Sequence, residues 1–424
     1  MSEKQNKLNR VQKRVKRHLS MSVREILDKM DEDRTRPKNM VYFDLLLNAF
    51  IKDSKRIMKK ENGQKVVGTY CILVPEELIY AAGAVPVRLC AGSYDTVENG
   101  EDYLPDISCP MVKSAIGFSA MPVIPLYQSC DLVVIPATCN WKVKMGEILK
   151  KFVPVLMLDL PRIKESENSR KFWLNEVNKF KQELQKLTGL KINRSRLRKA
   201  IKTIQKAQIE VRRFEKIRMS QLPVIRGRDA LAVMNTYFYD HVESWTEAVR
   251  GLNDELEERL CSGKTVCSSS TPRILLTGSP IIFPNWKMPA LIEESGGILV
   301  ADEFCTSNRY LHDMVALDEL LMSDMIHAIA DRYLLPCTCP IFSETLDRRN
   351  RISQMSDDYQ VEGVIYHILK GCHPYDAEMK TIEEMLKDKG IPQLKIETDF
   401  SPEDVEQIRT RIEAFIETIK GRRR

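Results

Sequence analysis

Residues 65–89 read KVVGTYCILVPEELIYAAGAVPVRL and contain one strand–helix–strand unit. The runs KVVGTY (65–70) and AVPVRL (84–89) are short, apolar and rich in β-branched residues, which is typical of buried strands. Between them, PEELIYAAG (75–83) has a helix-like pattern. A strand, a helix and a second strand in this order predict a parallel sheet with helices on its faces.

The same alternation continues on both sides of a different, helical stretch. Further strands are expected at 131–136, 154–160, 273–278, 296–302, 363–369 and 393–398. The sequence therefore predicts an α/β protein with two parallel-sheet domains. We divide it into N-terminal helices (1–60), a first α/β domain (61–160), a basic helical block (161–262) and a second α/β domain (263–424).

The helical block is strongly basic, whereas the chain of 424 residues carries a net charge of only +6. Residues 162–228 contain 20 Lys/Arg against 6 Asp/Glu. Apolar residues keep helical spacing at Leu184, Leu187, Leu190, Leu197, Ile201 and Ile204. Because the block lacks interleaved aromatic residues, we expect a solvated face or a docking surface for an acidic protein rather than a nucleic-acid interface.

The N-terminal segment predicts a helix that packs on the body of the protein. Its apolar residues Leu8, Val11, Val15 and Leu19 fall at helical spacing between basic residues. The opening residues have no apolar core of the kind found in secretory signals. Nowhere is there a run of about 20 apolar residues that would cross a membrane. We therefore expect a cytoplasmic protein that binds neither membrane nor nucleic acid.

Cysteine is the most informative residue type, with 11 in the chain. In a large chain without a secretory signal these thiols should be reduced. Cys71, Cys139, Cys305 and Cys372 each lie just past the end of a predicted strand, two in each α/β domain. Because the functional crevice of an open α/β sheet lies at the carboxyl ends of its strands, these four thiols should face one cleft.

Two loops can bring further thiols to the same cleft. Cys109 lies in DISCPMVKS, and Cys337 and Cys339 lie in PCTCP, where we favour Cys339 as the ligand. Zinc needs only four ligands, usually in CxxC pairs, and the chain has no CxxC. Iron–sulfur clusters accept widely separated cysteines. One [4Fe–4S] cluster takes at most four thiolates, whereas two linked cubanes would use three each.

The remaining cysteines are expected to lie outside this set. Cys130 precedes the strand that Cys139 follows, which separates the two by about 20 Å. Cys90 ends the strand at 84–89 and is expected to be buried. Cys261 and Cys267 lie at the edge of a polar linker and are not expected to bind metal.

Seven motifs resemble the family of 2-hydroxyacyl-CoA dehydratases and benzoyl-CoA reductases, which includes the double-cubane cluster oxidoreductases. They are GTYCILVPEELIYAAGAVPVRLC, ISCP, CDLVVIPATCNWKVKM, LTGSP, DEFCTSNR, RYLLPCTCP and VEGVIYHILKGCHPYDAE. The resemblance implies two Rossmann-like domains with an iron–sulfur cluster between them. In the dehydratases three cysteines hold a [4Fe–4S] cluster, and they match Cys109, Cys139 and Cys372.

The resemblance also implies a partner, a separate ATP-hydrolysing [4Fe–4S] activator that supplies electrons. The chain itself contains no GxxxxGK phosphate-binding loop, which agrees with ATP being used by another polypeptide. Two residues beside the cluster are candidates for proton transfer. Glu77 matches a family carboxylate, with Glu76 expected to face away, and His373 can donate protons or hydrogen-bond to a cluster sulfur.

The sequence departs from the dehydratases at Asn140 and Trp141, where those enzymes usually read TCDGKKK. With the additional Cys71, Cys305 and Cys339, it resembles more the double-cubane branch, in which six cysteines hold an [8Fe–9S] cluster. The first interpretation is thus a homodimeric, ATP-dependent reductase of small molecules. The alternatives are a radical dehydratase subunit with one [4Fe–4S] cluster and a CoA thioester substrate, or a zinc-stabilised nucleic-acid-binding protein.

Overall fold

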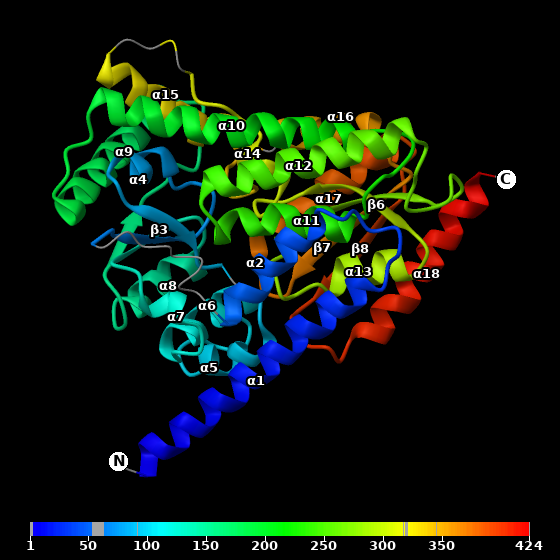
Figure 1. The fold of residues 1–424 in the computed structure, drawn as a ribbon, viewed down its shortest axis with the longest axis horizontal. Coiled ribbons are helices and arrows are strands. Elements are labelled where there is room, and N and C mark those ends of the chain that lie inside the picture. Colours follow the sequence, from blue (N-terminus) through cyan, green and yellow to red (C-terminus); the bar gives the residue numbers. More distant parts are fainter. Residues whose placement is uncertain are drawn as a thin grey trace.

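The computed structural model describes residues 3–52, 63–90, 92–316, 318, 321–344 and 346–423. Two four-stranded sheets, each wholly parallel, organise these residues (Figure 1). The first, in the order β2-β1-β3-β4, contains β1 (Val66–Thr69), β2 (Val85–Arg88), β3 (Leu132–Pro136) and β4 (Val155–Leu158). The second, in the order β6-β5-β7-β8, contains β5 (Arg273–Gly278), β6 (Ile298–Glu303), β7 (Gly363–Leu369) and β8 (Gln393–Thr398).

The predicted α/β fold and all eight predicted strands are confirmed. Every residue of β5 and β7 is buried, because helices cover both faces of the second sheet. In each sheet the strand that comes first in the chain lies in the interior of the sheet, so the connections leave it in opposite directions. This reversal creates a crevice beyond the carboxyl ends of β1 and β3 in one sheet and of β5 and β7 in the other.

Helices surround the two sheets and connect them. The first half contains α1 (Glu3–Asp31), α2 (Met40–Lys52), α4 (Glu76–Ala81), η1 (Tyr94–Thr96), α5 (Val97–Glu101), α6 (Pro110–Ala120), α7 (Pro125–Gln128) and α8 (Asn140–Leu149). The middle contains α9 (Glu167–Thr188), α10 (Arg194–Arg218), α11 (Gly227–Thr236), η2 (Tyr237–Tyr239) and α12 (Val242–Cys261). The second half contains α13 (Lys287–Glu294), α14 (Asn308–Leu311), α15 (Met322–Leu334), α16 (Leu346–Asp358), α17 (His373–Asp388) and α18 (Val405–Arg422).

The basic block forms long helices, and α10 and α12 run side by side across the molecule (Figure 1). The residues predicted to face inward are buried at Leu184, Leu197, Ile201 and Ile204. Leu190 differs from the prediction and is 43% exposed. The helix α9 ends before it at a glycine with φ +70°, so Leu190 no longer follows the apolar face.

The N-terminal helix α1 packs along the molecule as its spacing predicts, with Val15 and Leu19 buried. The side chain of Leu8, and residues 53–60 of the predicted helical segment, lie outside the described part of the chain. Among the described helices, none combines the length and the apolar character that crossing a membrane requires.

Candidate metal centre

A cavity of about 90 Å³ lies where loops from the two sheets meet. It is lined by the six cysteines predicted to face one cleft, together with a seventh. These residues are Cys71, Cys109, Cys139, Cys305, Cys339, Cys372 and Cys90. We call this space the thiol cavity. Thiols from opposite halves of the chain are thus brought together by the carboxyl ends of both sheets.

Three of these cysteines occupy equivalent positions at the start of helices. Cys109 is the N-cap of α6, Cys139 of α8 and Cys372 of α17. The unpaired amides and the dipole at the start of a helix favour a negative charge nearby. A thiolate is therefore stabilised at such a position, and a thiolate is the form that binds metal.

The loop after β7 approaches the loop of Cys109 very closely. Gly371, which has φ +73°, faces Ile107, and a Cβ atom at Gly371 would lie only 2.2 Å from the Ile107 carbonyl oxygen. Only glycine permits this approach. As a result the Cys372 thiol donates a hydrogen bond to Cys109, which lowers the pKa of Cys109 and raises that of Cys372.

Cys71 reaches the cavity through an unusual backbone conformation. It has φ +82°, a region that non-glycine residues rarely occupy. This residue lies between β1 and α4, and it lines the cavity. Strained conformations of this kind cost about 1–3 kcal/mol and cluster at functional sites.

Burial opposes ionisation of the thiols on the second-sheet side. It raises the pKa of Cys305 to about 12 and that of Cys339 to about 11, although the positive charge of Arg309 lowers both. Lys142 lies on the other side of the cavity, and burial lowers its pKa. The sulfurs of Cys71 and other lining cysteines outweigh that effect, so the pKa of Lys142 ends above its usual value. Burial therefore opposes thiolates at Cys305 and Cys339, whereas the charges of Arg309 and Lys142 favour them.

Arg309 belongs to a buried charge network behind the thiols. Glu303, the last residue of β6, accepts hydrogen bonds from Arg309 at 2.7 and 2.6 Å, from Thr338 at 3.1 Å and from Arg348. Burial raises the pKa of Glu303, but the charges of these arginines lower it by a larger amount. The pKa of Glu303 is therefore lowered to about 2. Arg309 also donates to the hydroxyl of Tyr375 at 3.0 Å, and Tyr375 lines the thiol cavity. The network therefore fixes one wall of the cavity.

The donor set fits a cluster better than a single ion. Among the described residues, no three His, Cys, Asp or Glu side chains come close enough together to hold one metal ion. An iron–sulfur cluster takes one thiolate at each iron, so its ligands surround a larger body. Thiols distributed around a cavity, with cations behind them, match that requirement.

An outer cleft of about 470 Å³ adjoins the thiol cavity. The two spaces share the lining residues Thr138, Cys139, Trp141, Ile341 and Pro374. The indole of Trp141 donates a hydrogen bond to the Gly371 carbonyl oxygen at 3.1 Å. Trp141 therefore stands between the outer cleft and the thiols, and it ties the first-sheet helix α8 to the loop of Cys372.

Replacing Trp141 with alanine should open this passage. We expect Trp141→Ala to cost about 1–3 kcal/mol of stability, less than a fully buried tryptophan, because the side chain is only half-buried. In protein that carries iron, a chelator should also remove the metal severalfold faster than from the wild type. Chelation followed by absorbance checks this, with Phe172→Ala, an exposed aromatic residue elsewhere, as the control. Equal rates in all three proteins would contradict a barrier at Trp141.

The two predicted proton-transfer residues lie at different places. His373 is exposed and lines the outer cleft. Glu77 is buried, accepts a hydrogen bond from Tyr333 at 2.8 Å and does not line either space. Glu76 is also buried, accepts a hydrogen bond from Tyr237 at 3.0 Å and feels the charge of Arg88. Neither carboxylate points freely into solvent.

Arg88 and Cys90 also line the cavity, although the sequence analysis did not place either of them there. Both lie at the carboxyl end of β2, so the rule applied to the other strands could have found them. Within the CxC motif, Cys339 lines the cavity, whereas Cys337 is buried outside it. Cys130 is also buried outside it and contacts the Leu126 carbonyl oxygen.

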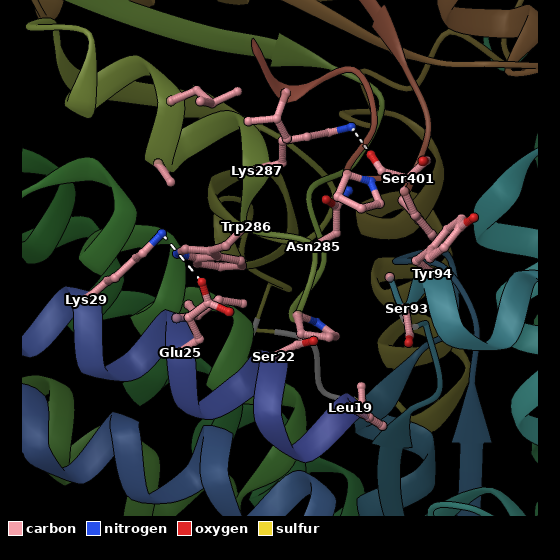
Figure 2. Close-up of a pocket in the computed structure, with 18 of the residues that line it drawn as sticks. Leu19, Ser22, Glu25, Lys29, Ser93, Tyr94, Asn285, Trp286, Lys287 and Ser401 are labelled. Carbon is pink, nitrogen blue, oxygen red and sulfur yellow. Dashed lines mark hydrogen bonds and ion pairs between the residues drawn. The ribbon is translucent and has the colours of Figure 1, made fainter. Parts of the chain in front are cut away.

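A third and larger pocket, of about 650 Å³, lies between α1, α13 and the start of α18. Figure 2 shows Glu25 and Lys29 of α1 close to Trp286, with Lys287 hydrogen-bonded to Ser401. Among its described lining residues there is no cysteine. This pocket is separate from the thiol cavity, and no sequence pattern indicated it.

Most of the chain matches one known protein family. Residues 71–419 match the model of the family described as 2-hydroxyglutaryl-CoA dehydratase, D-component. The chain belongs to this family. The match includes all seven cysteines that line the thiol cavity and both strands β5 and β7.

Proteins similar to this chain come from several bacteria. A protein of Escherichia coli K12 described as "Putative dehydratase subunit YjiM" is 35% identical over 85% of this chain and 93% of its own length. The (R)-phenyllactyl-CoA dehydratase beta subunit of Clostridium sporogenes is 25% identical over 86% and 95%. One of the subunits of benzoyl-CoA reductase from Thauera aromatica is 21% identical over 90% and 96%.

Proposed function

We propose that this chain is an iron–sulfur subunit of a 2-hydroxyacyl-CoA dehydratase or a related reductase. The observation that supports the proposal is the thiol cavity, where six predicted ligand cysteines from both sheets surround one space. Cys109, Cys139 and Cys372 would hold a [4Fe–4S] cluster at three helix N-termini. When bound, such a cluster supplies electrons of low potential.

The similar proteins favour the dehydratase form of this proposal, because most carry that description. In this form the substrate is a 2-hydroxyacyl-CoA thioester and the chain pairs with a different subunit. The electrons come from a separate ATP-hydrolysing [4Fe–4S] activator protein. Subunits of multi-component enzymes among the relatives support a requirement for protein partners.

The second candidate is a homodimeric reductase of small molecules with an [8Fe–9S] double-cubane cluster. It is favoured by Cys71, Cys305 and Cys339, which line the same cavity and exceed the needs of one cubane. Trp141 supports it as well, since its indole narrows the way from the outer cleft to the thiols. Either candidate would act in the cytoplasm.

The residues of this chain have distinct tasks in both forms. Lys142 and Arg309 offset the negative charge of thiolates in a buried space. Trp141 restricts water and bulky molecules. His373, at the edge of the outer cleft, can hold a proton on its imidazole for an incoming substrate. Glu77 would act through the Tyr333 hydroxyl, which donates to its carboxylate.

Iron and acid-labile sulfide per chain, measured on protein purified without oxygen, test the proposal. About four of each would support the dehydratase form, and about eight irons with nine sulfides would support the double cubane. In both outcomes the protein contains inorganic sulfide in an amount similar to that of iron. Protein that contains zinc but no sulfide would contradict the proposal in both forms.

A further inference from the structure

Arg88 is a buried cation in the wall of the thiol cavity. It ends β2, and only 3% of the residue is exposed. Among the described residues, its Nε and Nη1 atoms have no hydrogen-bond partner. These two nitrogens carry three N–H bonds. Burying donors without an acceptor is unfavourable, so these N–H groups are available to an acceptor that the described residues do not supply.

Aromatic rings hold the guanidinium in place. Its central carbon lies 4.3 Å from the centre of the Phe238 ring and 5.0 Å from that of Tyr310. Contact with a ring face leaves the edge of the guanidinium available for hydrogen bonds. That edge matches the two oxygens of a carboxylate better than it matches any neutral group.

The neighbouring charges leave this cation without a direct counterion. Among the described residues that line the cavity, Arg88 and Lys142 are cations and none is a carboxylate. The carboxylate of Glu76 acts on Arg88 through its charge, but it is occupied by the Tyr237 hydroxyl. Burial lowers the pKa of Arg88, but the sulfur of Cys90 and the charge of Glu76 raise it by a larger amount. The pKa of Arg88 is therefore raised, and the side chain stays charged.

We propose that Arg88 binds a carboxylate group of the substrate inside the thiol cavity. This inference rests on the proposed function, because it names the substrate class of the same site. The carboxylate can belong to a free small acid or to the acyl part of a thioester. Both sources present the same charge and the same pair of oxygens to the guanidinium.

Calorimetric titration of anaerobically purified, iron-containing protein tests the proposal with three probes. Succinate is a free acid, succinyl-CoA carries a carboxylate on its acyl group, and butyryl-CoA has a methyl group in its place. We expect at least about tenfold tighter binding of a carboxylate probe than of butyryl-CoA. Tight binding of succinate indicates a free acid, whereas tight binding of succinyl-CoA alone indicates an acyl-borne carboxylate.

The variant Arg88→Gln should remove this preference, and Arg88→Lys should retain part of it if the glutamine variant does not fold. The control is Arg332→Gln, since Arg332 is another arginine packed on an aromatic ring, 4.2 Å from the centre of Tyr333, but outside the cavity. Iron and sulfide are measured in every protein. An unchanged preference in the Arg88 variants would overturn the proposal.

Two other results would also overturn it. One is the absence of carboxylate preference in wild-type protein that carries iron. The other is loss of iron in both Arg88 variants with the preference intact, which would assign Arg88 to the cluster. A different result would be wild-type protein that contains no iron but still binds the carboxylate probes more tightly, in a way that depends on Arg88. That result would contradict the proposed function and leave the carboxylate site at Arg88 in place.

Discussion

The variant Cys372→Ser should lose nearly all of its iron if the cavity holds one cubane. Cys372 shares a hydrogen bond with Cys109 at the point where the two sheets meet, and serine is a poor ligand for iron. Cys71→Ser should keep about four irons in that case, because three other cysteines suffice. If two cubanes share the cavity, each variant should instead keep about half of the wild-type iron.

Iron and sulfide assays on both variants distinguish these cases in a single experiment. Cys130→Ser is the matched control, because Cys130 is buried like Cys71 but lies outside the cavity. It should keep the full complement of iron. Full retention in both Cys372→Ser and Cys71→Ser would show that the thiol cavity is not where iron binds.

The largest loss of folding stability is expected for Glu303→Gln. Glu303 is fully buried and is held by Arg309 and Arg348, and a neutral amide would leave buried arginines without a counterion. Breaking a buried ion pair in this way typically costs about 3–5 kcal/mol. Urea unfolding under anaerobic conditions, at equal iron content, measures the difference from the wild type.

This loss should depend on pH in a defined direction. The pKa of Glu303 is lowered from 4.5 to about 2, so its contribution is complete above the unfolded value of 4.5 and is lost as pH falls toward 2. The gap between wild type and variant should therefore stay constant from about pH 8 to 5.5 and shrink below pH 4.5. Glu257→Gln, which breaks an exposed pair with Arg213, should cost less than about 1 kcal/mol. A similarly small cost for Glu303→Gln would refute the stabilising role of the network.

Much of the fold could be predicted because parallel strands are apolar along their whole length. Runs such as GVIYHIL (363–369) have only one favourable place, the interior of a covered sheet. Leu190 was misplaced because the end of a helix depends on a single residue, here Gly189, more than on the apolar period.

The candidate site could be predicted in part for a related reason. The end of a strand fixes where the next side chains lie, so Cys139 and Cys372 could be placed together from sequence. The buried partners could not, since Arg348 reaches Glu303 from α16, 45 residues along the chain. Ion pairs between residues so far apart in the chain cannot be predicted from local sequence patterns. The same limitation applies to the aromatic rings that hold Arg88.

The backbone at Cys71 bears on how this protein could change over generations. Cys71 has φ +82°, a conformation that glycine adopts without strain. A mutation of this residue to glycine would therefore relax the main chain. Such a change would relieve this backbone strain while deleting a sulfur from the cavity wall. Lineages that need this thiol must keep the strained cysteine, whereas lineages that do not need it are free to accept glycine. The residue at this position therefore serves as a natural record of whether a relative uses the thiol.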